Sequence, residues 1–288
     1  MEYLIHIAIF VSIYGILGLS LNLSTGEAGI LSVAQAAFYG IGAYGATLLM
    51  LGAGLNFFLA VPVAMFLTGC IALLIGIVFS QLREVYYVFC TVGFNVIAYS
   101  IMLNWDSLTR GPLGIPGIPR PAIFGFRFSD NASFLLLAIV LLAATYAISR
   151  FITTSSFGRV LHAIREDEEV TSVFGYSVCY YKLAIFVISA MLAALAGTLF
   201  ATYITYIDPS SFTLNESIFI LAIIILGGLA SERGALLGAL LLVILPEALR
   251  FVGFPSDIAA QMRQVVYGLI LILLMLYRPQ GILGKFRM

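Results

Sequence analysis

Long apolar segments alternate with short polar stretches along nearly the whole chain. About 20 helical residues cross a hydrocarbon core of about 30 Å, and backbone polar groups in lipid must be hydrogen-bonded within the protein. Segments that meet or approach this length run 3–22, 29–50, 57–79, 85–103, 132–151, 183–205, 216–230, 234–252 and 262–277. The pattern predicts an all-α, polytopic transmembrane helix bundle of about 8–10 spans. Because 216–230 is short and 29–50 can be partly re-entrant, the number of full spans and the side of the N-terminus stay open.

One stretch, 155–182, interrupts this pattern with polar residues. Its charged residues are Arg159, Arg165, the run Glu166-Asp167-Glu168-Glu169, and Lys182. Its apolar residues form two sets, Val160, Leu161 and Ile164 in the first, and Val170, Val173 and Phe174 in the second. At about 100° per residue the two sets do not align on one helix face, which predicts two short helices bent near the acidic run. Gly175 suits a helix C-terminus.

The polar stretch is either a solvated loop with scattered charges or a docking element. Two apolar faces on one loop favour docking against a soluble partner. We therefore interpret 153–182 as a cytoplasmic loop that binds another protein.

The basic residues predict the orientation. Seven of the fourteen Lys and Arg residues lie in or beside the polar stretch and in the tail: Arg150, Arg159, Arg165, Lys182, Arg278, Lys285 and Arg287. Cytoplasmic loops carry an excess of basic residues, and four predicted spans separate the two groups, so both fall on the cytoplasmic side. The Gly- and Pro-rich loop 104–131 then lies outside, although it also contains Arg110, Arg120 and Arg127.

Composition agrees with a membrane protein. Hydrophobic residues make up 62% of the chain and charged residues 10%, whereas soluble domains carry about 25% charged residues. A net charge of zero gives no indication of a nucleic-acid partner. Cys70, Cys90 and Cys179 have no paired spacing, which favours packing roles over disulfides or metal ligands.

Motifs for nucleotide binding and catalysis are not supported. Gly40–Gly45 fits G-x-G-x-x-G, but it lies within an apolar span, where small residues serve close helix packing. The Gly-Lys pair in Gly284-Lys285-Phe286 does not continue as a phosphate-binding loop, so ATP, if used, is bound by another chain. His6 and His162 stand in no ligand or triad spacing, and we expect no enzymatic activity.

Five polar residues within the spans are candidates for a translocation path: Ser32, Gln35, Tyr39, Thr91 and Asn95. Such residues face either a path or a neighbouring helix, and the sequence leaves both open. The spans contain no series of acidic residues that would predict a proton relay.

Two Gly-rich breaks share the spacing E-x-G-x-L, Glu27 to Leu31 and Glu232 to Leu236. Interrupted segments at matching places in two halves of a chain are typical of transporters. A match over five positions also arises by chance.

Several motifs together resemble the LivM-type permeases, the membrane subunits of branched-chain amino acid ABC importers. They are Leu21–Gly26, Ala36–Tyr44, Asn104–Thr109, Gly114–Pro119, Gly158–Glu168, Tyr181-Lys182-Leu183 and Arg278-Pro279-Gln280-Gly281. The resemblance covers nearly the whole chain and implies a single permease domain, 1–288, in a bacterial or archaeal cytoplasmic membrane. It also implies substrate movement by alternating access.

The resemblance further implies that 153–182 docks on an ATPase through an E-A-A-x-x-x-G-like pattern. Glu169 and Gly175 keep that spacing, while Val170 and Thr171 replace its alanines. The implied coupling residues are Arg159, Arg165, Glu168, Glu169 and Gly175. The implied partners are two ATP-binding cassette subunits, a second homologous permease, a periplasmic or lipid-anchored substrate-binding protein and the bilayer, with no cofactor in this chain.

The chain departs from the family pattern at Asn95-Val96, where a Gly-Glu-like pair is expected. The loss of an acid within a span leaves the substrate open. Urea, a short amide or another small polar metabolite is the alternative within the family, and an ion-coupled secondary transporter is the alternative outside it.

Overall fold

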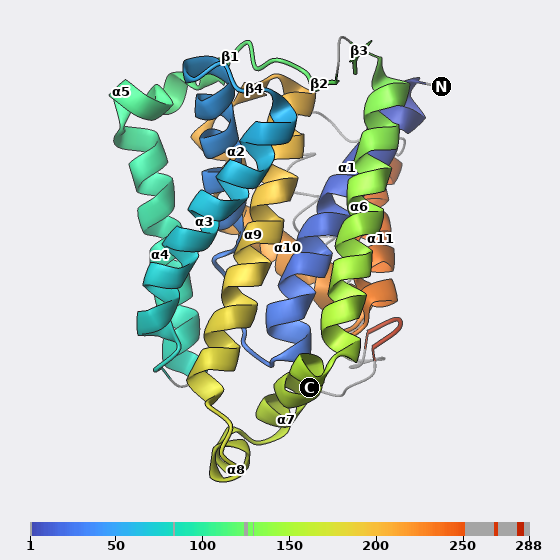
Figure 1. Cartoon of the computed structure of the whole chain (residues 1–288). Coiled ribbons are helices and arrows are strands. Elements are labelled where there is room, and N and C mark those ends of the chain that lie inside the picture. Colours follow the sequence, from blue (N-terminus) through green and yellow to red (C-terminus); the bar gives the residue numbers. More distant parts are fainter. Residues whose placement is uncertain are drawn as a thin grey trace.

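The computed structural model describes residues 2–82, 84–123, 126–128, 130–250, 268–269 and 281–284. These residues form a bundle of long helices that lie roughly side by side (Figure 1). Before the polar loop the elements are α1 (Glu2–Leu21), a π-helix η1 (Asn22–Glu27), α2 (Gln35–Gly52), α3 (Phe57–Phe79), α4 (Glu84–Asn104), α5 (Asp106–Thr109), η2 (Gly111–Leu113), β1 (Ile115–Pro116), β2 (Ala122–Ile123), β3 (Phe126–Arg127) and α6 (Asn131–Thr154). They continue with α7 (Ser156–Glu166), α8 (Glu168–Val173), α9 (Val178–Ile204), β4 (Tyr206–Ile207), η3 (Pro209–Phe212), α10 (Leu214–Gly227) and α11 (Glu232–Arg250).

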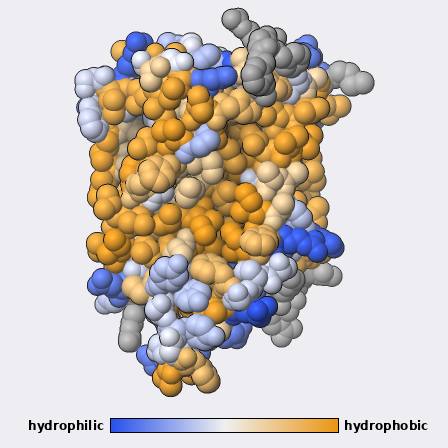
Figure 2. Space-filling view, viewed as in Figure 1, coloured by the Kyte–Doolittle hydropathy of each residue, from blue (hydrophilic) through white to orange (hydrophobic). Residues whose placement is uncertain are grey.

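Among the described residues, five helical segments are long and apolar enough to cross a membrane: Glu2–Glu27, Phe57–Phe79, Val85–Asn104, Asn131–Thr154 and Val178–Ile204. Each agrees with a predicted span to within about one helical turn. Figure 2 shows the matching surface, a hydrophobic belt around the middle with hydrophilic residues gathered towards both ends. The all-α membrane bundle is confirmed.

Three other predicted segments, 29–50, 216–230 and 234–252, correspond to the helices α2, α10 and α11. The segment 29–50 becomes helical only at Gln35, and the segment 216–230 is the short helix α10. The second E-x-G-x-L stretch lies inside the first turns of α11, so it is not itself a break. The ninth segment, 262–277, lies outside the described residues apart from 268–269.

Small residues hold the centre of the bundle together, where α9 packs against α1, α2 and α3. A Cβ atom on Gly42 of α2 would lie 2.3 Å from Ala194 Cα, and one on Gly197 would lie 2.1 Å from the carbonyl oxygen of Tyr39. Both distances are too short for any side chain, so the backbones of α2 and α9 are in direct contact. The predicted packing role of the glycines in 40–45 is confirmed.

The two ends of the bundle are distinct. The N-terminus lies at the end opposite α7 and α8, together with the loop 104–131, whose strand β1 pairs antiparallel with β4 (Figure 1). At the other end, Ile282 and Leu283 donate backbone hydrogen bonds to Leu226 and Gly227 beside the polar loop. The C-terminal segment and the polar loop therefore share one side, as the basic residues predict.

Candidate substrate path and coupling loop

The helix α2 starts in the middle of the bundle rather than at its end. The stretch 28–34 leads from the base of α1 back to that level without helical structure. The backbone N–H of Val33 donates to Thr91 Oγ1 (3.2 Å), and its carbonyl accepts from Asn95 Nδ2 (3.1 Å). Asn95 lies midway along α4, so two side chains of α4 fix both polar groups of Val33 at mid-depth.

The helix α10 also starts at mid-depth and runs in the opposite direction to α2. Tyr14, midway along the span 2–27, donates to Glu216 Oε1 in the first turn of α10 (2.6 Å). At the other end of α10, the backbone N–H of Ala230 donates to Asn22 Oδ1 (3.0 Å). The helix therefore follows the second half of α1 towards the side of the polar loop.

The two helix N-termini meet through one hydroxyl. Ser217 Oγ, in the first turns of α10, accepts from the backbone N–H of Ala36 (2.9 Å) and from Asn95 Nδ2 (2.6 Å). Gln35, the first residue of α2, links the meeting point of the two helix N-termini to α1 by donating to Ser20 Oγ (2.5 Å). Each helix N-terminus carries about half a positive charge, so two such ends in the membrane interior favour a negative group between them.

The five predicted path residues are all buried, at 0–2% exposure. Thr91 and Asn95 form the hydrogen bonds to Val33, and Gln35 bonds to Ser20. Ser32 Oγ accepts from the backbone N–H of Ala34 (3.4 Å). Tyr39 lies one turn further along α2, between the rings of Phe200 and Phe212. The structure therefore brings the five residues together around the break.

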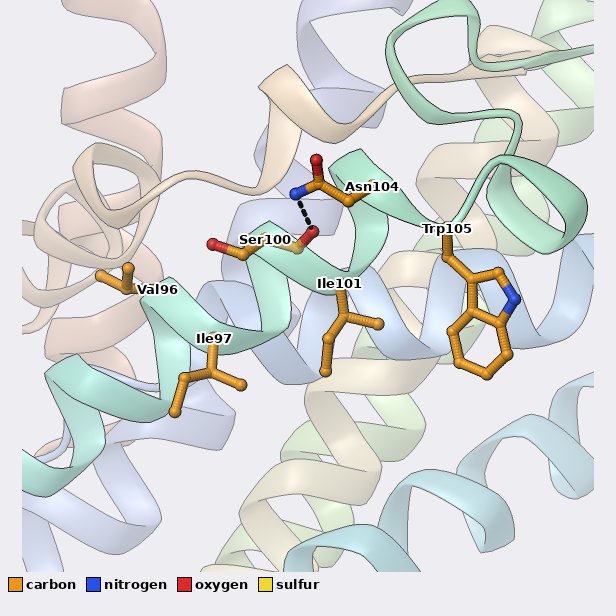
Figure 3. Close-up of a pocket in the computed structure, with 6 residues that line it drawn as sticks. All are labelled: Val96, Ile97, Ser100, Ile101, Asn104 and Trp105. Atoms are coloured by element: carbon orange, nitrogen blue, oxygen red, sulfur yellow. Dashed lines mark hydrogen bonds between the residues drawn. The ribbon is translucent and has the colours of Figure 1, made fainter.

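An open groove on the outer face of α4 is separate from this site. It is lined by Val96, Ile97, Ser100, Ile101, Asn104 and Trp105 (Figure 3). Val96 is 48% exposed there, whereas the adjacent Asn95 is fully buried on the inner face of the same helix.

Glu216 is a residue that the sequence analysis did not single out. It is the first residue of the predicted segment 216–230, and the spacing Thr213-x-x-Glu216 fits a capping box. In the structure the Thr213 side chain makes no capping bond, and the carboxylate of Glu216 bonds across to α1. Glu216 therefore lies at mid-depth in the bundle, whereas Val96, which stands where the resemblance leads us to expect an acid, lies in the groove on the outer face of α4.

The polar loop forms the two bent helices that the sequence predicts. The chain bends at Asp167, whose backbone is extended and whose Oδ1 accepts from the N–H of Val170 at the start of α8 (3.0 Å). Gly175, with a φ of 87°, takes the left-handed conformation just after α8. The predicted helix-ending role of Gly175 is confirmed.

The two apolar faces of the loop differ in their exposure. Leu161 and Ile164 on α7 are buried against the bundle, at 0% and 4% exposure, so the first face is not free for a partner. On α8, Val170, Val173 and Phe174 are 50%, 86% and 76% exposed. Figure 2 shows hydrophobic residues at this tip of the molecule, beyond the belt.

The predicted coupling residues also divide into those on the exposed surface and one, Arg165, that contacts the bundle. Arg159 and Glu169 are exposed, and Glu168, beside the exposed face, pairs with Lys182. Arg165 instead donates to the carbonyl of Gly26 in η1. Burial lowers the pKa of Arg165 from its ordinary value, while the charges of Glu27 and Glu166 oppose this shift.

A second contact joins α7 to η1. His162 Nε2 lies 3.1 Å from Glu27 Oε2, and the Glu27 side chain is 3% exposed. The sequence indicated only a core or surface role for His162, because one sequence does not reveal a partner 135 positions away in the chain. The π-helix η1 directly precedes the break, so α7 is connected to the start of α2 through the seven residues 28–34.

Comparison of the sequence with known proteins shows the family to which the chain belongs. The family model for the permease component of branched-chain amino acid transport systems matches residues 3–275. The chain is 36% identical to the high-affinity branched-chain amino acid transport system permease protein LivM of Escherichia coli K12, over 98% of this chain and 70% of that protein. It is 28% identical to BraD of Pseudomonas aeruginosa, over 95% and 92% of the two chains.

The chain also matches a permease protein with another name, LivH, from a high-affinity branched-chain amino acid transport system. It is 32% identical to LivH of Escherichia coli K12, over 66% of this chain and 63% of that protein. No solved structure matches the chain. The bundle and its mid-membrane break define a multi-pass transport protein, and the chain belongs to the family of branched-chain amino acid transport permeases.

Proposed function

We propose that the chain is the membrane subunit of an ATP-driven importer for branched-chain or related amino acids. It works with two ATP-binding cassette subunits, a second homologous permease and a substrate-binding protein, in the cytoplasmic membrane of a bacterium or archaeon. The chain itself holds no cofactor in this proposal, because the partner subunits bind the ATP. The observation that carries the proposal is the connection between a mid-membrane break and an exposed docking helix.

The connection has three parts. The apolar face of α8 projects from the bundle and offers a contact to a soluble subunit. Its neighbour α7 is fixed to η1 by the contacts of Arg165 and His162. Because η1 leads into the break, a displacement of α7 by an ATPase moves the backbone that Asn95 and Thr91 hold at mid-depth.

The names of the relatives support branched-chain amino acids as the substrates. One observation favours an ion-coupled secondary transporter instead, namely the carboxylate of Glu216 at the membrane centre, since buried acids serve as coupling sites. The energy source of uptake separates the two functions.

The test is substrate uptake into proteoliposomes that contain the chain with its co-expressed partner subunits. We expect uptake of radiolabelled leucine that needs internal ATP and loaded binding protein and persists with a protonophore. Uptake without ATP that is abolished by the protonophore would identify the secondary transporter.

The docking surface has its own test. Val173→Asp places a charge on the exposed face of α8 and should abolish co-purification of the ATPase subunits. Leu113→Asp is the matched control, because Leu113 is 82% exposed at the opposite end of the bundle, against 86% for Val173. If both variants retain the ATPase subunits equally, α8 is not the docking element.

A further inference from the structure

We propose that Glu216 and Asn95 bind the ammonium group of a zwitterionic substrate, while Tyr39 and the N-terminus of α2 bind its carboxylate. This inference rests on the proposed function and assigns the residues that recognise the substrate within the chain. It concerns four chemical groups that surround the break.

Glu216 is costly to keep at the membrane centre. A carboxylate loses its hydration there and must be compensated by hydrogen bonds or an opposite charge. Tyr14 supplies one hydrogen bond at 2.6 Å, and the N-terminus of α10 supplies a favourable dipole. A carboxylate accepts about four hydrogen bonds, so it retains capacity for a donor such as an ammonium group.

A capping role for Glu216 predicts a different geometry. In a capping box, the acidic side chain returns to the N-terminus of its own helix. Here the carboxylate reaches across to Tyr14 on α1, and the Thr213 side chain makes no capping bond. Glu216 therefore stands between helices, at the level where the two N-termini meet.

Two buried polar atoms near the break have no hydrogen-bond partner among the described residues, Asn95 Oδ1 and the Tyr39 hydroxyl. Both side chains are almost completely buried, at 0% and 1% exposure. Buried polar atoms in proteins are usually paired, and each exception calls for an explanation. The amide of Asn95 already holds both Ser217 and Val33 at the break, so its unpaired oxygen belongs to the same corner.

The two unpaired atoms have complementary chemistry. The Asn95 oxygen only accepts hydrogen bonds and suits an ammonium group, whereas the Tyr39 hydroxyl can donate to a carboxylate. Tyr39 lies one turn beyond Ala36 on α2, and the backbone N–H of Ala36 donates to Ser217, the residue after Glu216. Phe200 and Phe212, which flank Tyr39 at ring-centre distances of 5.5 and 5.0 Å, offer an apolar surface for the substrate side chain.

These groups favour an amino acid over an uncharged substrate. The positive N-terminus of α2 and the carboxylate of Glu216 match the opposite charges of a zwitterion. Urea and short amides can form hydrogen bonds to both elements, but they carry no net charge and gain no charge pairing from either. Of the two substrate classes that the family resemblance leaves open, the site therefore favours amino acids over urea and short amides.

The test compares two carboxylates that each accept a hydroxyl hydrogen bond from another helix. Glu216→Gln keeps an acceptor for Tyr14 but removes the charge. Glu232→Gln is the matched control, because Glu232 Oε1 accepts from Thr153 Oγ1 (2.8 Å) near the cytoplasmic end. Leucine uptake by the reconstituted complex is measured against the concentration of loaded binding protein, together with the amount of assembled complex.

We expect Glu216→Gln to lower the maximal uptake rate by about tenfold or more, with the half-saturating concentration of binding protein unchanged. Glu232→Gln should stay within about twofold of wild type. Glu216→Gln uptake within about twofold of wild type would overturn the assignment. Loss in proportion to lost assembly, or a change only in the half-saturating concentration, would overturn it as well. Failure of the wild-type complex to use ATP would instead refute the proposed function.

Discussion

Replacing Asn95 with leucine tests whether its amide holds the break at mid-depth. The substitution removes the bonds from Nδ2 to the Val33 carbonyl (3.1 Å) and to Ser217 Oγ (2.6 Å). Water does not reach this fully buried position, so the two acceptors lose a donor that solvent cannot replace. At about 1 kcal/mol for each bond, the free energy of unfolding should fall by about 2 kcal/mol.

The assay is thermal unfolding of the purified full chain in detergent. A loss of about 2 kcal/mol corresponds to a decrease in Tm of about 4–8 °C for a protein of this size class. Asn104→Leu provides the control on the same helix. Asn104 is exposed and donates only to Ser100 O within α4 (2.8 Å; Figure 3), so its Tm should change by less than about 1 °C.

One outcome of this comparison would contradict the prediction. If Asn95→Leu and Asn104→Leu shift the Tm equally, the amide at position 95 does not hold the break. Equal shifts would also remove the basis for placing the start of α2 at mid-depth. A decrease in Tm for Asn95→Leu alone supports both the role of the amide and the placement of the start of α2 at mid-depth.

Two further predictions concern helix packing and coupling. Gly197→Val places a side chain against the Tyr39 carbonyl, 2.1 Å from an added Cβ, and should destabilise the chain by at least about 1–3 kcal/mol in the same unfolding assay. Gly93→Ala, where an added Cβ meets no atom within 4 Å, should leave stability unchanged or raise it, and equal losses would contradict direct contact between α2 and α9. Arg165→Ala, which releases α7 from Gly26, should raise the ATP hydrolysed per leucine transported about twofold to thirtyfold, the range of about 0.5–2 kcal/mol of coupling energy. An unchanged ratio would show that this contact does not carry the coupling.

The long spans were predictable because lipid imposes length and hydrophobicity on any helix that crosses it. The bend at Asp167 was predictable for a similar reason, since two apolar sets that do not share a face cannot belong to one packed helix. The sequence did not show which set faces the bundle, because Leu161 and Phe174 are equally apolar and differ only in what lies beside them.

The site was predictable only in part. Gln35 and Asn95 stood out as polar residues within apolar segments, yet their partners come from α1 and α10, far away in the chain. Glu216 escaped notice because an acid at the edge of an apolar segment usually marks the membrane surface. Its depth follows from the early start of α10, which depends on tertiary bonds such as that from Tyr14.

The start-to-start arrangement of α2 and α10 gives each half of the bundle's depth its own helix. At 1.5 Å per residue, the 18 residues of α2 provide about 27 Å of helix towards one face, and the 14 residues of α10 provide about 21 Å towards the other. Because η1 and the break lead directly into α2, the contacts of α7 with η1 connect the polar loop to the helix that runs towards the opposite end of the bundle.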